Sequence, residues 1–169
     1  MRQLFSLLLS ALLLSPVWAA QPAPVQRYFQ DLKSLRADFI QRVFDERARV
    51  VQSSSGQMLM QKPGKFRWNY RTPAEQIIVA DGDRLWAYDV DLAQVTVRKL
   101  DKALGSTPLA LLSGAAPIEE TFTVGDARSE DGLAWYELTP RQPQPEFKLL
   151  RVAFKGDLLV SLELEDAFN

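Results

Sequence analysis

The sequence contains no histidine and no cysteine among its 169 residues. These two absences exclude Ser–His–Asp and Cys–His catalysis, disulfide bonds, and zinc sites built on His or Cys ligands. The sequence also has no large excess of positive or negative charge, because 20 Lys and Arg are balanced by 21 Asp and Glu. Such a balance gives no support to nucleic-acid binding, which usually leaves a basic footprint. An enzymatic mechanism would have to use carboxylates, Lys, Tyr or Ser alone.

The first residues have the pattern of a secretory signal peptide. Arg2 forms a short positive region, Leu4–Leu14 is apolar apart from two serines, and Ala19 is a small residue at the expected cleavage point. The apolar run is shorter than the ~20 residues that a membrane span requires. We therefore expect residues 1–19 to be cleaved and residues 20–169 to form a single soluble, exported domain.

Most of the remaining chain predicts short antiparallel strands. A helix is expected after Pro24, where Val25, Tyr28 and Leu32 recur at steps of three and four. The best hairpin signal is Asp81-Gly82, and other Gly-containing turns separate the later strands. We predict a strongly twisted sheet or incomplete barrel with two or three helical segments. The predicted strands are 37–43, 50–61, 65–70, 75–80, 84–89, 95–97, 122–127, 133–139, 148–154 and 158–164.

Residues 107–114 predict a short helix that is apolar on more than one side. Thr107 suits its cap, Pro108 its first position and Gly114 its end. Its apolar residues are Leu109, Ala110, Leu111 and Leu112. A helix of this kind is either a plug in the core of a β domain or a lid over an apolar cavity, and the pattern leaves both open.

Bulky apolar side chains are dense between residues 58 and 88, mostly on single faces of the predicted strands. Two interpretations of this density remain open: ordinary core packing and an apolar binding surface. The methionines are compatible with a binding surface, because the unbranched Met side chain tolerates variable partners. The side chains are Met58, Met60, Phe66, Trp68, Tyr70, Ile78, Trp86 and Tyr88.

The charged residues predict no reaction centre. The aspartates around the Asp81-Gly82 hairpin lack the tight ligand spacing of a calcium loop, so we expect solvated turn carboxylates. Glu119 and Glu120 are neighbours just before the strand predicted at 122–127, and if this segment is extended as well, consecutive side chains point to opposite faces. We therefore expect no catalytic residue, no metal site and no cofactor.

An ordered set of motifs covers nearly all of the chain after residue 19. It comprises 37–41 (Ala-Asp-Phe…Gln), Ser55-Gly56, 62–70 (Lys-Pro-Gly-Lys-Phe-Arg-Trp-Asn-Tyr), Pro73, Glu75-Gln76, 78–82 (Ile-Val-Ala-Asp-Gly), Leu85-Trp86, Tyr88-Asp89, Asp91-Leu92, Gln94-Val95 and Thr107-Pro108-Leu109…Leu111-Leu112. Together these segments resemble the LolA family of periplasmic carriers of outer-membrane lipoproteins.

The resemblance implies a mainly β fold with short helices: an unclosed barrel, made of a strongly curved antiparallel sheet, with an α-helical lid over an apolar cavity. It implies a lipid-binding cavity at Phe39, Met58, Met60, Phe66, Trp68, Ile78 and Trp86. It implies a lid at Leu109, Ala110, Leu111 and Leu112. The family usually has an Arg that bonds to the lid backbone and holds the lid closed, and this chain has Lys62 at that position. The resemblance therefore implies that Lys62 is the lid latch, although Lys keeps the charge but lacks the planar fork of Arg.

The resemblance also implies a function and partners. The chain is expected to be a soluble periplasmic chaperone, a monomer and not an enzyme. It would accept acylated lipoproteins from an inner-membrane ABC transporter and deliver them to an outer-membrane receptor. Family chains continue past the segment matching Leu158–Asp166 by at least one strand, so we expect the last strand or strands to be missing here.

Two other functions are compatible with the same residues. One is an envelope sensor of lipids or misfolded proteins that uses the same fold. The other is a periplasmic hydrolase using carboxylates such as Glu119, Asp126 or Glu137, although their spacing does not recommend it.

Overall fold

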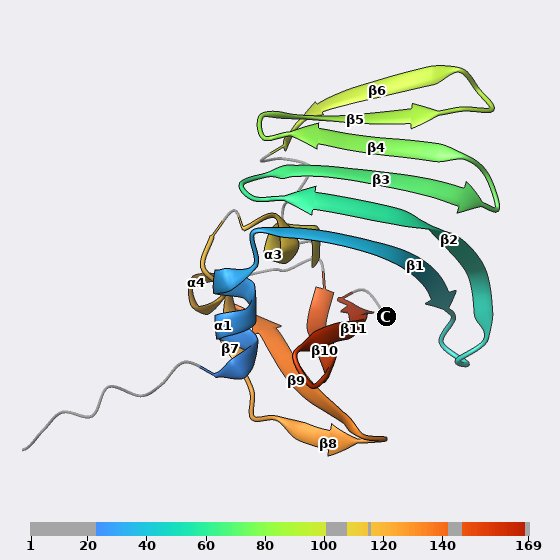
Figure 1. The fold of residues 1–169 in the computed structure, drawn as a ribbon. Coiled ribbons are helices and arrows are strands. Elements are labelled where there is room, and N and C mark those ends of the chain that lie inside the picture. Colours follow the sequence, from blue (N-terminus) through green and yellow to red (C-terminus); the bar gives the residue numbers. More distant parts are fainter. Residues whose placement is uncertain (1–22, 101–107, 115, 142–146, 168–169) are drawn as a thin grey trace, which may run out of the picture.

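Two antiparallel sheets make up most of the protein (Figure 1). The computed structural model describes residues 23–100, 108–114, 116–141 and 147–167, with the backbone alone for residues 108–110. The large sheet is a meander in chain order. Its strands are β1 (Ser34–Phe44), β2 (Val50–Gln61), β3 (Lys65–Thr72), β4 (Gln76–Asp81), β5 (Arg84–Asp89) and β6 (Gln94–Lys99).

The small sheet is built from the second half of the chain. Its strand order is β11 (Leu158–Asp166), β10 (Phe147–Lys155), β9 (Leu133–Pro140) and β7 (Phe122–Val124), and β8 (Arg128–Glu130) also pairs with β9. Within the described residues no strand of one sheet pairs with a strand of the other. The barrel is therefore unclosed, which confirms the predicted fold class.

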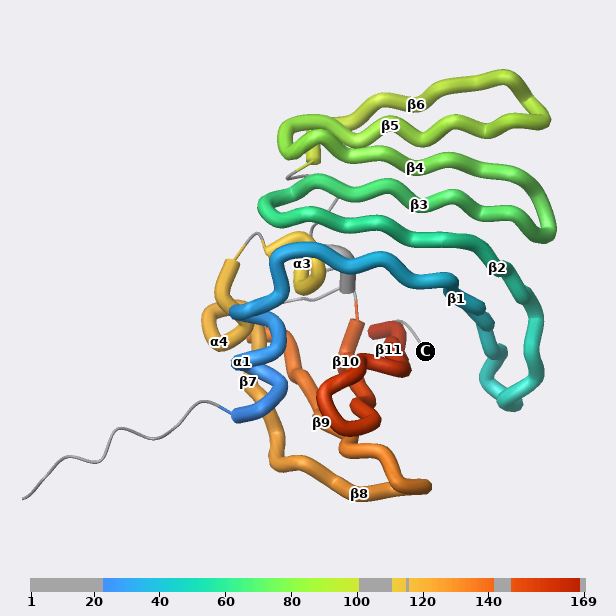
Figure 2. Tube along the Cα trace, in the orientation of Figure 1, coloured from blue at the N-terminus to red at the C-terminus, as the bar shows by residue number. Residues whose placement is uncertain are grey.

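Three described helices accompany the sheets: α1 (Pro24–Asp31), α3 (Pro108–Ser113) and α4 (Ile118–Thr121). Figure 2 shows the large sheet curving over α1 and α3, with the small sheet on the other side of these helices. None of the described helices is long and apolar enough to cross a membrane. α1 begins at Pro24, whose fixed φ suits the first helical position, and it buries Val25 and Phe29.

One hydrophobic core joins the facing sides of the two sheets. The large sheet contributes Met58, Met60, Phe66 and Ala80, and the helices contribute Val25, Phe29, Leu111, Leu112 and Ile118. The small sheet contributes Tyr136, Leu138, Phe147, Leu150, Val152 and Phe154. Edge-to-face ring contacts connect the layers, since the Tyr28 and Phe154 centroids lie 4.9 Å apart.

The periodicity predicted the large sheet closely, and β2 and β5 have the predicted bounds. At the Asp81-Gly82 turn, the Asp81 carboxylate accepts hydrogen bonds from the backbone N–H groups of Arg84 and Asp83, each 2.9 Å long. These two bonds, that of Arg84 first, lower the pKa of Asp81 below its ordinary value.

Two expectations about the second half of the chain are wrong. Glu119 and Glu120 lie in the first turn of α4 rather than on a strand, after Pro117 at the N-cap. Acidic residues are favourable at a helix N-terminus, a signal that the strand interpretation overlooked. β8 is an additional strand, too short to give a periodic pattern.

Candidate functional site

The side of the large sheet that faces the core, here called the inner face, becomes less buried along its strands. Residues paired directly across antiparallel strands share a face, so the register defines rows of neighbouring side chains. In one row Met60 and Phe66 are each only 4% exposed. Two residues further along the strands, Trp68 and Ile78 are half-buried. The inner face therefore has a sealed end near the helices and a more open end.

The row that contains Trp68 carries no charged side chain. Its members are Ala37, Met58, Trp68, Ile78, Ala87 and Thr96. The adjoining row toward the open end is more polar: the Tyr70 hydroxyl donates to the Gln41 side-chain oxygen over 3.1 Å. Burial raises the pKa of Tyr70, so its hydroxyl stays protonated at neutral pH. The inner face thus changes from apolar to polar along the strands.

An aromatic cluster covers the middle of the inner face. The Trp68 ring centroid lies 6.1 Å from Phe39, 6.2 Å from Phe66 and 6.2 Å from Tyr70. Phe39 can lie close to the sheet because its cross-strand partner is Gly56, which has no side chain. A Cβ at Gly56 would stand 3.0 Å from Phe39 Cε1 and 2.1 Å from the Asn69 carbonyl oxygen. Gly56 is therefore required for this packing.

Within the described structure, the indole Nε1 of Trp68 is a buried donor without a hydrogen-bond partner. Leaving a buried donor unsatisfied costs about 1–3 kcal/mol. Such groups are rare in folded proteins, and each requires an explanation.

The prediction that Trp86 lines the same surface is wrong. Ile78 pairs with Ala87 and Val79 pairs with Trp86, so Trp86 lies on the opposite face of the large sheet from Trp68. On that outer face its cross-strand neighbour is Val97, which is 49% exposed. The other six residues predicted for the cavity share the inner face, and their role in binding remains a prediction.

α3 packs its leucines into the core. Leu111 and Leu112 are 5% and 2% exposed, and they belong to one cluster with Met58, Met60 and Phe66. Leu109 and Ala110 lie in the same helix, but their side chains are outside the described part of the chain. A short apolar helix is therefore present at Pro108–Ser113, and it covers the sealed end of the inner face; the predicted cap at Thr107 lies outside the described residues.

The C-terminal end of α3 is attached to the β2–β3 turn. The backbone N–H of Gly64 donates to the Ser113 carbonyl oxygen over 3.1 Å. Gly114 ends the helix with φ +68°, a conformation that favours glycine. A Cβ on Gly114 would stand 2.6 Å from both Cδ and Cε of Lys62, so the Lys62 stem lies directly against the end of α3.

Lys62 also reaches the first helix. Its ammonium donates to the carbonyl oxygen of Phe29, near the C-terminal end of α1, where the helix dipole favours a cation. Burial lowers the pKa of Lys62 below its ordinary value. Lys62 therefore contacts both α1 and the residue that ends α3, a position suited to a latch, and the latch role itself stays a prediction.

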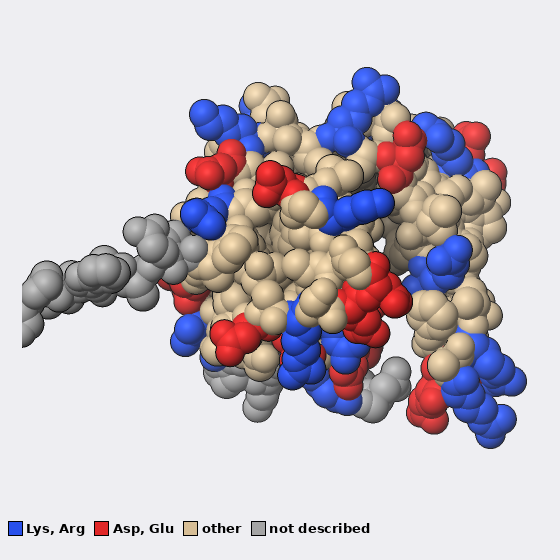
Figure 3. Space-filling model, turned by 60° about the horizontal axis from the view of Figure 1, so that its bottom comes forward, with Lys and Arg blue, Asp and Glu red and all other residues tan. Residues whose placement is uncertain are grey.

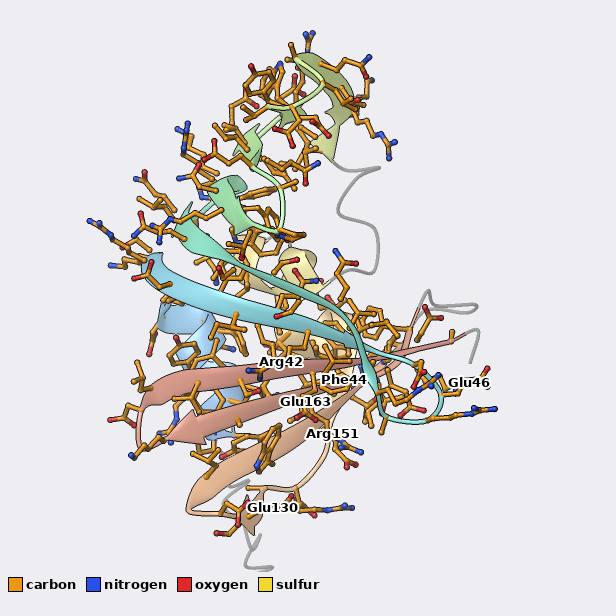
Figure 4. The ribbon with its side chains drawn as sticks, turned by 90° about the vertical axis from the view of Figure 1, so that its right-hand side faces the viewer. Arg42, Phe44, Glu46, Glu130, Arg151 and Glu163 are labelled. Carbon is orange, nitrogen blue, oxygen red and sulfur yellow. The ribbon has the colours of Figure 1, made fainter. Side chains whose placement is uncertain are left out.

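A separate depression of about 320 Å³ lies on the outer face of the small sheet. Glu137 there is 3.5 Å from Arg128 and 3.7 Å from Arg151. Arg151 is also 3.6 Å from Glu163 on the neighbouring strand, and Figure 4 shows these two side chains close together. Figure 3 shows acidic and basic groups mixed on this side of the molecule. Both arginines of this depression are already paired with Glu137 or Glu163, so we take the inner face of the large sheet as the candidate site.

Several residues of the site could not be predicted from the sequence. The backbone groups of Phe29, Gly64 and Ser113 take part through main-chain atoms, which leave no side-chain pattern. The sequence could have indicated on which face of the sheet Trp86 lies, because a two-residue turn at Gly82-Asp83 fixes the pairing of β4 with β5.

Comparisons with known proteins agree with this architecture. The family model described as "Outer membrane lipoprotein carrier protein LolA" matches residues 30–169. An outer-membrane lipoprotein carrier protein of Nitrosomonas europaea is 41% identical over 170 residues, covering 99% of this chain and 82% of that protein. One of Nitrosospira multiformis is 45% identical over 147 residues, covering 86% of this chain and 70% of that protein.

A solved structure of a LolA superfamily protein from Nitrosomonas europaea matches 86% of this chain and 70% of that one, at 14% identity and a TM-score of 0.44. We base no conclusion on this structural similarity, because its TM-score is low. The family match spans well over half of the chain, and both relatives exceed 40% identity. The chain therefore belongs to the LolA family of outer membrane lipoprotein carrier proteins.

Proposed function

We propose that this protein shelters the acyl chains of lipoproteins between the inner face of the large sheet and α3. In this proposal it works in the periplasm, accepts its cargo from an inner-membrane ABC transporter and delivers it to an outer-membrane receptor. The observation that carries the proposal is the uncharged row around Trp68, next to an apolar face covered by the leucines of a short helix.

A carrier is needed because acyl chains are very unfavourable in water. Each CH₂ removed from water contributes about 0.8 kcal/mol. A lipoprotein with three fatty-acid chains has roughly 40 such groups, so about 30 kcal/mol opposes free diffusion. A carrier can bind acyl chains about as tightly as the donor and the acceptor do. The large free energy of removing the chains from water then nearly cancels at each transfer.

The same residues explain how the empty protein keeps an apolar surface out of water. Leu111 and Leu112 occupy the position that acyl chains would take against Met60 and Phe66. Loading then exchanges one apolar contact for another, and the carrier needs no catalytic group. The proposal includes removal of residues 1–19 on export, a single domain over residues 20–169 and a monomeric carrier.

A single engineered cysteine tests this exchange, because the natural sequence has no cysteine. In a Leu111→Cys variant the thiol replaces a side chain that is 5% exposed, so it should react slowly with a thiol reagent. Saturation with a tripalmitoylated cysteinyl peptide should accelerate the reaction at least tenfold, because cargo displaces the helix.

Leu158→Cys provides the matched control, because Leu158 is 63% exposed on β11. Its thiol should react rapidly and at the same rate with or without the lipopeptide. Saturable lipopeptide binding without any change at Leu111→Cys would refute the exchange of lid for cargo. Absence of binding would refute the carrier function itself.

A further inference from the structure

The unsatisfied indole N–H of Trp68 suggests a recognition role that simple apolar packing does not explain. The Nε1 atom is inaccessible to solvent and has no acceptor among the described residues. Its neighbours Phe39, Phe66 and Tyr70 present aromatic rings, and the members of its row are uncharged. A phenylalanine at this position would still place an aromatic ring in the cluster, without a buried donor.

We infer that the Trp68 N–H binds the carbonyl oxygen at the head of an acyl chain, and thereby selects acylated ligands over other apolar molecules. This inference rests on the proposed function, since it assigns a specificity group within the same site. A ligand that brings a carbonyl oxygen to Nε1 satisfies the orphan donor. A pure hydrocarbon leaves it unsatisfied, and an alkyl ether offers only a weaker acceptor oxygen in place of the carbonyl.

The chemistry of the surroundings favours a neutral acceptor. A carboxylate or phosphate at this depth would lose its hydration and gain a single neutral N–H in return, which is strongly unfavourable. Ester and amide carbonyls have a much smaller desolvation cost, and one hydrogen bond compensates it. Trp68 therefore fits the ester or amide group that joins a fatty acid to its carrier molecule.

The position of Trp68 along the inner face also fits an amphiphilic ligand. On the sealed side of Trp68 the neighbouring row holds Met60 and Phe66, which suit a hydrocarbon tail. On the other side lie Gln76 and the Tyr70–Gln41 hydrogen bond, which suit a polar head. A carbonyl between tail and head would then lie level with Trp68, so the ligand enters with its tail toward α3.

Two lysophospholipids that differ in one carbonyl test the inference. The first is 1-palmitoyl-lysophosphatidylcholine, an ester, and the second is its 1-O-hexadecyl ether analogue; both are titrated below their micelle concentration by calorimetry. A net hydrogen bond corresponds to roughly a 2- to 13-fold change in affinity. The ester should bind wild-type protein at least about threefold more tightly, and Trp68→Phe should abolish that preference.

Trp86→Phe is the matched control, since it removes the same N–H from the opposite face of the sheet. It should retain the ester preference of the wild type. A direct measurement on the wild-type protein covers the case in which Trp68→Phe does not fold. The indole N–H proton resonance of Trp68 should move clearly further downfield with the ester than with the ether.

The outcomes separate the inference from the function on which it rests. Equal affinity of the wild type for both lipids, or an unchanged indole resonance with bound ester, overturns the inference while leaving the carrier function intact. An equal loss of affinity for both lipids in Trp68→Phe assigns Trp68 a packing role and also overturns it. Failure of both lipids and of a tripalmitoylated cysteinyl peptide to bind overturns the proposed function.

Discussion

Gly114→Ala should destabilise the protein by more than the backbone alone explains. Alanine at φ +68° costs about 1–2 kcal/mol, because its Cβ crowds the neighbouring carbonyl in the left-handed region. The new Cβ would also stand 2.6 Å from Cδ and Cε of Lys62, so that side chain must move. Moving it breaks the hydrogen bond from its ammonium to Phe29, and a bond to a charged group contributes about 1.5–3 kcal/mol.

Gly132→Ala isolates the backbone cost. Gly132 has φ +76°, and a Cβ there would meet no atom within 4 Å. Urea denaturation should therefore give a loss of about 1–2 kcal/mol for Gly132→Ala and about 2.5–5 kcal/mol for Gly114→Ala. The difference between the two variants measures the contact with Lys62.

A double-mutant cycle then identifies Lys62 as the source of that difference. In a Lys62→Ala background the obstructing stem is gone, so Gly114→Ala should cost only about 1–2 kcal/mol. The reasoning is refuted if Gly114→Ala costs no more than Gly132→Ala, or if its cost is the same with and without the Lys62 side chain.

Three further predictions concern stability. Gly56→Ala should lower the thermal midpoint severely, since its Cβ would stand 2.1 Å from the backbone oxygen of Asn69; a midpoint within a few degrees of wild type by circular dichroism contradicts this. Leu112→Ala should cost about 2–5 kcal/mol in urea denaturation, against less than about 0.5 kcal/mol for the exposed Leu158→Ala, and similar losses would show that α3 is not packed as described. Because burial lowers the pKa of Lys62, the unfolded chain retains its proton at alkaline pH values where the folded chain has lost it. The stability of wild type relative to Lys62→Met should therefore rise as pH increases from 7 toward 10, and a fall contradicts the assigned direction.

The sequence predicted the strands well because a half-buried strand repeats every two residues. Phe66, Trp68 and Tyr70 alternate with Lys65, Arg67 and Asn69, and this pattern alone locates β3 and its inner face. On β5 both faces are apolar, so alternation does not distinguish Leu85 from Trp86. The deciding information is the pairing of β5 with β4, which is a property of two strands together.

The contacts of Lys62 show a different limit of sequence reasoning. The charge and position of Lys62 were visible, but its described acceptor is a carbonyl oxygen 33 residues away in α1. Any residue type could supply that oxygen, so no pattern at Phe29 marks it. Gly114 was expected to end the helix, yet its second role arises only because the Lys62 stem packs against it.

In the proposed carrier α3 acts as a lid, and its two buried leucines set the scale of the energy that would separate the empty and loaded states. Exposing Leu111 and Leu112 to water costs about 1.5–3 kcal/mol for each side chain, so opening the empty protein is opposed by about 3–6 kcal/mol. Under the proposed function, this cost would hold an open form at about one molecule in a hundred or fewer. It is small beside the roughly 30 kcal/mol associated with three acyl chains. The proposal therefore expects cargo to displace the helix, whereas the empty protein would keep its apolar face covered.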